Sequence, residues 1–165
     1  MGFLPGILLV LLALFAAPGL CALVRGHSPR AAYARLGLGR GKVLVISPFD
    51  PYRELLLDTL RQAGHRPYPA EPRTALTDLR TGRYQIVVSG LVLPFLTGVE
   101  LLAAVKTACP GTKVVLLTGE PNGVLATDAI RRGAFAVLDK GSMGDLARCV
   151  DQALTRARNG TVAAA

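Results

Sequence analysis

The sequence predicts an α/β fold in which helices cover both faces of a five-stranded, doubly wound parallel sheet. Two observations predict it. From Lys42 onward, short runs rich in β-branched residues alternate with stretches in which apolar residues recur at helical spacing. The short runs are continuously apolar instead of alternating with polar residues, which is what strands buried on both faces of a parallel sheet require.

Four of the five predicted strands are apolar runs of four to six residues. They are VLVI at 43–46, QIVVS at 85–89, KVVLLT at 113–118 and AVLD at 136–139. A βαβ architecture follows, because parallel strands need a crossover connection and the stretches between these runs are long enough to form helices.

The remaining strand, HRPYPA at 65–70, contains Pro67 and Pro69, and neither has the N–H that a strand ladder needs. Because alternate residues of a strand direct their N–H groups to the same side, both missing donors lie on one side, and that side must face solvent. This strand therefore belongs at the sheet margin. A strand order of 2-1-3-4-5 places it there, and that order is the flavodoxin-like one.

Helical spacing of apolar residues, as at Leu55, Leu56, Leu60 and Ala63, predicts a helix after each strand. The five helices are expected at residues 51–64, 72–81, 98–109, 122–132 and 143–157. Asp50 is expected to cap the first of them, which begins near Pro51.

An uncharged apolar run from residue 3 to 24 precedes this predicted fold. At about 1.5 Å per helical residue, it is long enough to cross a bilayer core of about 30 Å. Two interpretations stay open for residues 1–24, a transmembrane anchor, which we favour, and an over-extended gene start. As an anchor in the inner membrane, it would leave the following domain in the cytoplasm, because the basic linker at 25–41 carries four arginines and no acid.

Half of the net charge of +8 lies in that linker, and the remaining 15 basic residues are scattered among 11 acidic ones. We therefore expect no nucleic-acid interface, which would need basic residues gathered on one face. The three cysteines and two histidines form no close-spaced pattern, so neither a metal site nor a disulfide framework is expected.

Three segments resemble the core motifs of response-regulator receiver domains. They are IVVSGLVLPFLTGVELL at 86–102, VVLLTGEPN at 114–122 and GAFAVLDK at 133–140. The resemblance covers about residues 42–157 and leaves residues 158–165 as a tail. Its most specific element is the pair Leu93 and Pro94 followed by Gly98, which is similar to the turn after the third strand of receivers.

In that family, the resemblance implies, two acids after the first strand hold Mg²⁺, and an aspartate ending the third strand accepts a phosphoryl group. A threonine or serine and a lysine contact the transferred group. Here Ser47 and Pro48 stand at the positions of the acidic pair, and Gly90 stands at the phosphoacceptor position. Thr118 and Lys140 are retained. Without the carboxylates we expect no acyl phosphate, no metal and no cofactor.

The function expected from this pattern is that of a pseudo-receiver in bacterial two-component or phosphorelay signalling. It would not be an enzyme, and it would act by phosphorylation-independent interaction with another signalling protein, such as a histidine kinase, a regulator or an output protein. In typical receivers the partner face is formed by helix four, strand five and helix five. Here those elements carry Arg131, Arg132, Arg148, Arg156 and Arg158.

An alternative is a non-covalent sensor of an anion or small molecule. The carboxyl edge of an open α/β sheet is where ligands bind, and Thr118 and Lys140 would serve such a site. A phosphorelay receiver that uses another residue is disfavoured, because Ser89 should face away from the side on which Gly90 lies. Only a short stretch follows the last predicted helix, so any output is expected to come through a partner.

Overall fold

The computed structural model describes residues 41–48, 51–82 and 84–162. Its main sheet has five parallel strands in the order β2-β1-β3-β6-β7, which confirms the predicted 2-1-3-4-5 arrangement. The strands are β1 (Lys42–Ile46), β2 (Arg66–Ala70), β3 (Ile86–Gly90), β6 (Lys113–Thr118) and β7 (Ala136–Asp139).

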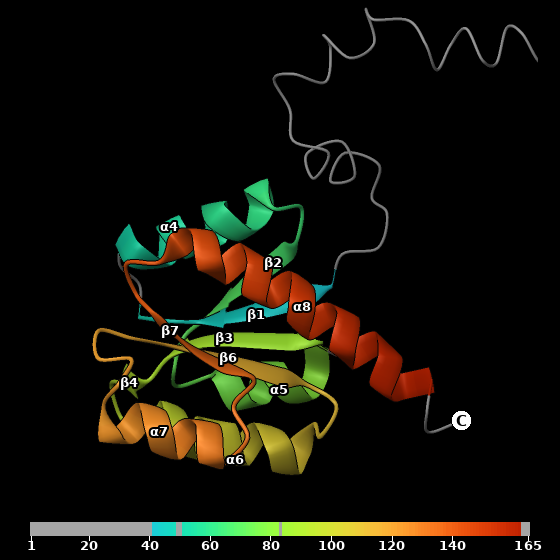
Figure 1. Cartoon of the computed structure of the whole chain (residues 1–165). Helices are drawn as coiled ribbons and strands as arrows, with labels where there is room; N and C mark the ends of the chain where they lie inside the picture. The colour runs from blue at the N-terminus through green and yellow to red at the C-terminus, as the bar shows by residue number, and fades with distance from the viewer. Residues whose placement is uncertain (1–40, 49–50, 83, 163–165) are drawn as a thin grey trace, which may run out of the picture.

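Five helices cover the two faces of this sheet (Figure 1). One face carries α4 (Pro51–Gln62) and α8 (Met143–Val162), and the other carries α5 (Ala75–Gly82), α6 (Gly98–Ala108) and α7 (Val124–Arg131). Helix α8 continues to Val162, beyond its expected end at residue 157 and into the expected tail. Helix α5 begins at Ala75 instead of residue 72, because Pro72 belongs to a turn in which the Thr74 N–H donates to the Glu71 carbonyl at 3.0 Å.

Both faces of the sheet are buried, as the continuous apolar runs predict. In β1, Val43 and Val45 pack toward α4 and α8, whereas Leu44 and Ile46 pack toward the opposite layer. All four side chains are almost completely excluded from solvent. Burying an aliphatic side chain of this size stabilises the fold by about 2 kcal/mol, so each strand contributes to two cores at once.

The proline-containing strand β2 lies at the sheet margin, as predicted. It pairs only with β1, with Pro67 opposite Val43 and Pro69 opposite Val45. The Arg66 N–H donates to the Gly41 carbonyl at 3.4 Å, so the prolines between the bonded positions direct their missing donors away from β1.

The buried stripe of α4 differs from the predicted one. Leu56, Leu57 and Leu60 are buried, and Arg53 lies on the same face. Leu55, which was expected in this stripe, is 50% exposed, so that assignment is wrong. The observed stripe starts at Arg53, two residues before Leu55, and this start brings a charged side chain into the interior.

A short hairpin that the sequence did not predict follows β3. Strands β4 (Val92–Leu93) and β5 (Leu96–Thr97) pair antiparallel around Pro94 and Phe95. Phe95 has a φ of 69° and its ring is largely exposed. The hairpin leads the chain back to Gly98, whose N–H donates to the Leu91 carbonyl at 2.8 Å.

Helix α6 begins with a capping box between Thr97 and Glu100. The Thr97 N–H and hydroxyl donate to Oε2 of Glu100 at 2.8 and 2.9 Å, and the Glu100 N–H donates to the Thr97 hydroxyl at 3.2 Å. The backbone hydrogen bond from Thr97 and then its hydroxyl hold the pKa of Glu100 below its ordinary value of 4.5.

The Glu100→Gln variant is expected to be less stable than the wild type near neutral pH but not in acid. Because the folded pKa of Glu100 is lowered, its charge stabilises the fold above the unfolded pKa, and this stabilisation is lost as the pH falls through the folded pKa. Urea unfolding of both proteins from about pH 7 to about pH 3 measures the difference. A difference that stays constant over this range would contradict the prediction.

The hydrophobic segment at 1–24, the linker up to residue 40 and the proposed cap Asp50 lie outside the described residues, so those predictions stand as they were made. Among the residues that the structure does describe, no helix is both long and apolar enough to cross a membrane.

Candidate functional site

The fold brings the predicted site residues to one edge of the sheet. Ser47 follows β1, Gly90 ends β3, Thr118 ends β6 and Lys140 follows β7. Because the strands are parallel, their carboxyl ends meet at this edge, and β1, β3, β6 and β7 are successive neighbours in the sheet.

The first part of the edge carries no carboxylate where the resemblance expects the acidic pair. Ser47 is buried, and its N–H donates to the Ala70 carbonyl at 3.4 Å. Pro48 is half-buried and has no side-chain donor or acceptor. These two residues offer one hydroxyl and no negative charge.

Gly90, at the end of β3, likewise offers only backbone atoms because glycine has no side chain. It is half-exposed, and its carbonyl accepts a hydrogen bond from the hydroxyl of Ser89 at 3.2 Å. A Cβ atom on Gly90 would lie 3.2 Å from Cδ2 of Leu93 and 3.2 Å from the Val92 carbonyl oxygen. A side chain could enter here only if both the Leu93 side chain and the Val92 backbone shifted slightly.

Thr118 and Lys140 are joined through their backbones, since the Lys140 N–H donates to the Thr118 carbonyl at 2.9 Å. The Thr118 hydroxyl is buried and accepts a hydrogen bond from the Glu120 N–H at 3.1 Å. Nζ of Lys140 lies 5.7 Å from the centre of the Tyr52 ring, and the Tyr52 hydroxyl donates to the Lys140 carbonyl at 3.3 Å. The lysine is thus near an aromatic face, which attracts a cation.

Acidic residues do occur at this edge, but at other positions. Glu71 follows β2 and bonds to Arg53, and Asp139 ends β7 and accepts a hydrogen bond from the Gly141 N–H at 2.6 Å. Among the described residues, no group of three or more potential ligands surrounds a common point. The described residues at this edge therefore do not fit Mg²⁺, which is held by carboxylates together with substrate oxygens.

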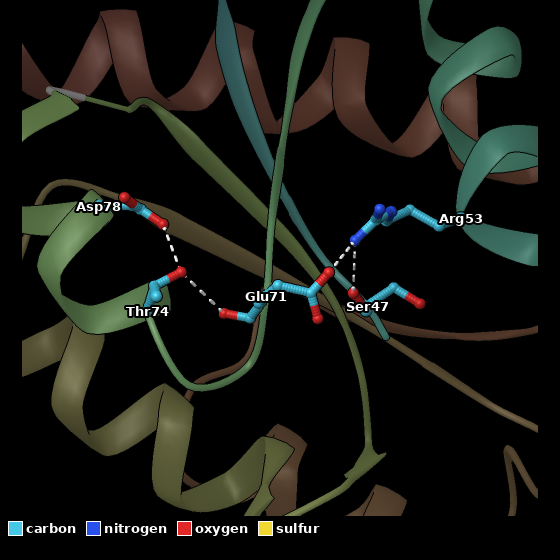
Figure 2. A network of polar contacts seen from close by, with 5 residues as sticks. All are labelled: Ser47, Arg53, Glu71, Thr74 and Asp78. Atoms are coloured by element: carbon cyan, nitrogen blue, oxygen red, sulfur yellow. Dashed lines mark hydrogen bonds and ion pairs between the residues drawn. The ribbon is translucent and has the colours of Figure 1, made fainter. Parts of the chain in front are cut away.

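The sequence prediction missed an ion pair beside Ser47, between a buried arginine and an exposed glutamate (Figure 2). Nη1 of Arg53 donates to Oε1 of Glu71 at 2.5 Å and to the Ser47 carbonyl at 3.4 Å. The Arg53 side chain is 8% exposed and that of Glu71 is 50% exposed. The pair ties α4 to the turn between β2 and α5, where Thr74 continues the chain of polar contacts to Asp78 (Figure 2).

Glu71→Ala is expected to cost more stability than Arg53→Met. The first change removes a carboxylate from a guanidinium that stays buried, which costs about 2 kcal/mol for a pair of which one member is half-exposed. The second leaves a carboxylate that water can hydrate, and its cost is about 1 kcal/mol. Urea unfolding of both variants compares the two values, and the opposite order would show that the pair does not stabilise the fold in this way.

The arginines expected on the partner face lie on α7 and α8, on either side of β7. Arg132 bonds to Asp128 at 2.7 Å and Arg148 bonds to Asp145. Arg156 lies over the ring of Phe135 with its guanidinium carbon 5.3 Å from the ring centre. Arg131 is exposed in the last turn of α7. The side chain of Arg158 lies outside what the structure describes.

The two described cysteines are free thiols, Cys109 half-buried and Cys149 buried. Burial and then the charge of Asp145 raise the pKa of Cys149 to about 11, so its thiol stays protonated near neutral pH. Neither thiol forms a disulfide within the part of the chain that the structure describes. Cys21 lies outside the described part of the chain.

Comparison with known proteins shows which family and which relatives the sequence matches. The sequence profile of the family described as "Response regulator receiver domain" matches residues 43–151. The response regulator protein FleR of Pseudomonas aeruginosa is 32% identical over 100 residues, which are 60% of this chain and 21% of FleR. This chain thus spans about a fifth of that relative's length.

Two solved structures have the same fold. The signal receiver domain of an HD domain-containing protein from Pseudomonas fluorescens is 26% identical, with a TM-score of 0.67, and the match covers 73% of this chain and 99% of that one. A response regulator receiver domain protein from Clostridium thermocellum is 25% identical, with a TM-score of 0.64, over 71% of this chain and 96% of that one.

Proposed function

This chain belongs to the response regulator receiver domain family, and from that membership we propose that its receiver domain acts without being phosphorylated, by docking other proteins. A receiver domain works in two-component signalling, where receivers interact with histidine kinases and output domains. The finer proposal is that this one is a pseudo-receiver, and that it is not an enzyme.

The observation that carries the proposal is the absence of a carboxylate from three positions. Ser47, Pro48 and Gly90 stand where the family's chemistry requires acids. An acyl phosphate needs a carboxylate as the nucleophile, and neither a hydroxyl nor a glycine can form one. The guanidinium of Arg53 lies 3.4 Å from the Ser47 carbonyl, and the nearby carboxylate of Glu71 is already paired with it.

The residue at the family's switch position on β7 also supports a docking function over a sensing one. The half-buried Val137 stands where many receivers have the aromatic residue that completes their switch, so a signal from this edge would lack that relay. The surface around β7 remains as the part of the domain that can bind a partner.

The proposal is tested by treating the full chain with acetyl phosphate and Mg²⁺ and measuring its intact mass. No phosphoryl adduct is expected. A second arm adds beryllofluoride and follows the amide signals of Thr118 and Lys140 by NMR, and these should not move. An adduct would refute the proposal, and shifted signals without an adduct would favour a non-covalent anion sensor in its place.

A further inference from the structure

The two edges of the sheet differ in their capacity to accept another strand. On β2, Pro67 and Pro69 leave the outer side without two of its N–H donors. Strand β7, Ala136–Asp139, contains neither proline nor lysine, and all four of its residues are half-buried. Within the described residues no strand pairs with its outer side, so β7 presents a free row of backbone donors and acceptors.

A groove runs beside this free edge, between β7 and α8, which lie next to each other at the front of Figure 1. Its volume is about 410 Å³. Its lining combines an apolar floor from β7 with polar and charged side chains from α8. The lining residues are Phe135, Ala136, Leu138, Asp145, Arg148, Cys149, Gln152 and Arg156.

The groove carries unbalanced positive charge. Asp145 is the only acidic residue in its lining, and it is already bonded to Arg148. Arg156 lies over the Phe135 ring, and no ion pair joins it to an acid in the part of the chain that the structure describes. A guanidinium held in place by an aromatic ring can form a charge-assisted hydrogen bond with an incoming carboxylate at little entropic cost.

We propose that β7 binds an extended acidic segment of a partner protein as a sixth strand of the sheet, an inference that rests on the proposed docking function. Ala136 and Leu138 pack toward α8, whereas Val137 packs toward the opposite layer. Residues of the added strand that lie beside Ala136 and Leu138 therefore face the groove. The matching segment has a carboxylate at every second position, so that one reaches Arg156 while its backbone pairs with β7.

The probe for this proposal is a fluorescein-labelled hexapeptide of alternating glutamate and valine, titrated with the full chain and followed by anisotropy. A lysine–valine peptide of the same length is the charge control, and it should bind at least about tenfold more weakly. Arg156→Glu should weaken binding of the glutamate peptide by about the same factor. Arg80→Glu makes an equal change of charge at an exposed position on α5, and it should leave binding of the glutamate peptide unchanged.

Backbone pairing is tested separately from charge by two further glutamate–valine peptides. One is N-methylated at its odd residues and the other at its even residues. An added strand directs alternate N–H groups toward its neighbour, so one of these peptides should lose binding and the other should keep it. Equal binding of both would mean that charge alone attracts the peptide, and it would overturn the proposal.

Three other results would also overturn it. The first is equal binding of the glutamate peptide to Arg156→Glu and Arg80→Glu, and the second is no binding of that peptide to the wild type. The third is a dimer of the chain that Arg156→Glu dissociates and the peptide does not, which would assign the edge to a second copy. Repeating the titration with acetyl phosphate and Mg²⁺ separates the two proposals. A phosphoryl adduct would refute the phosphorylation-independent function. Failure of the peptide to bind would refute only the proposal that β7 binds an acidic segment of a partner.

Discussion

The Gly98→Ala variant is expected to lose about 3 kcal/mol of unfolding free energy, which corresponds to a fall of about 10 °C in melting temperature. The reason is the close approach of the start of α6 to the end of β3 and to Leu91, the residue that follows it. A Cβ atom on Gly98 would lie 2.8 Å from the Gly90 carbonyl oxygen and 2.8 Å from Cα of Leu91. Both are backbone atoms, so no side-chain rotation can relieve the contact, and the helix must move away from the sheet.

The matched control is Gly144→Ala in the first turn of α8. A Cβ atom there would meet nothing within 4 Å, and alanine favours a helix over glycine by up to about 1 kcal/mol. This variant should be as stable as the wild type or slightly more stable. Urea and thermal unfolding of the full chain measure both changes. If Gly98→Ala proved as stable as Gly144→Ala, the described approach of α6 to Gly90 and Leu91 would be wrong.

The variant with an acid at all three positions, Ser47→Asp, Pro48→Asp and Gly90→Asp, is expected to show Mg²⁺-dependent phosphorylation, which we propose that the wild type does not undergo. Ile46 pairs with Ser89, so the next residues along the two strands, Ser47 and Gly90, are neighbours at the carboxyl edge. Carboxylates at these positions supply the oxygen ligands and the nucleophile that the wild type is missing. The expected change is from no adduct to a stoichiometric one, measured by intact mass after treatment with acetyl phosphate.

The control for this experiment is Gly90→Asp alone, which has a nucleophile but not the acidic pair. It should remain unphosphorylated, or react far more slowly than the triple variant, with or without Mg²⁺. Circular dichroism verifies that both proteins fold, since the new side chain at residue 90 must displace the Leu93 side chain and the Val92 backbone slightly. A folded triple variant that binds Mg²⁺ and stays unphosphorylated would show that loss of the acids is not what disables this site.

Part of the candidate site could be predicted from the sequence. Ser47, Pro48 and Gly90 are read directly from it, so the lack of carboxylates at these positions follows as soon as the strands are aligned. The pairing of Arg53 with Glu71 was missed. Spacing alone places Arg53 on the apolar face with Leu56 and the other buried leucines, but a charged side chain in such a pattern is normally assigned to solvent. Its partner lies 18 residues away, across β2, and only the fold brings the two together.

By itself the sequence determined the alternation of strands and helices, the marginal position of β2 and the missing acids. These depend on the chemistry of single residues and on periods of a few residues, which act before any distant contact forms. Tertiary structure alone decided the β4–β5 hairpin, the ion pair of Arg53 and the groove between β7 and α8. Each of these requires segments that are distant along the chain, or a turn held in place by its neighbours, to pack in one particular arrangement. Local patterns do not encode such packing, because its free energy arises only when the partners meet.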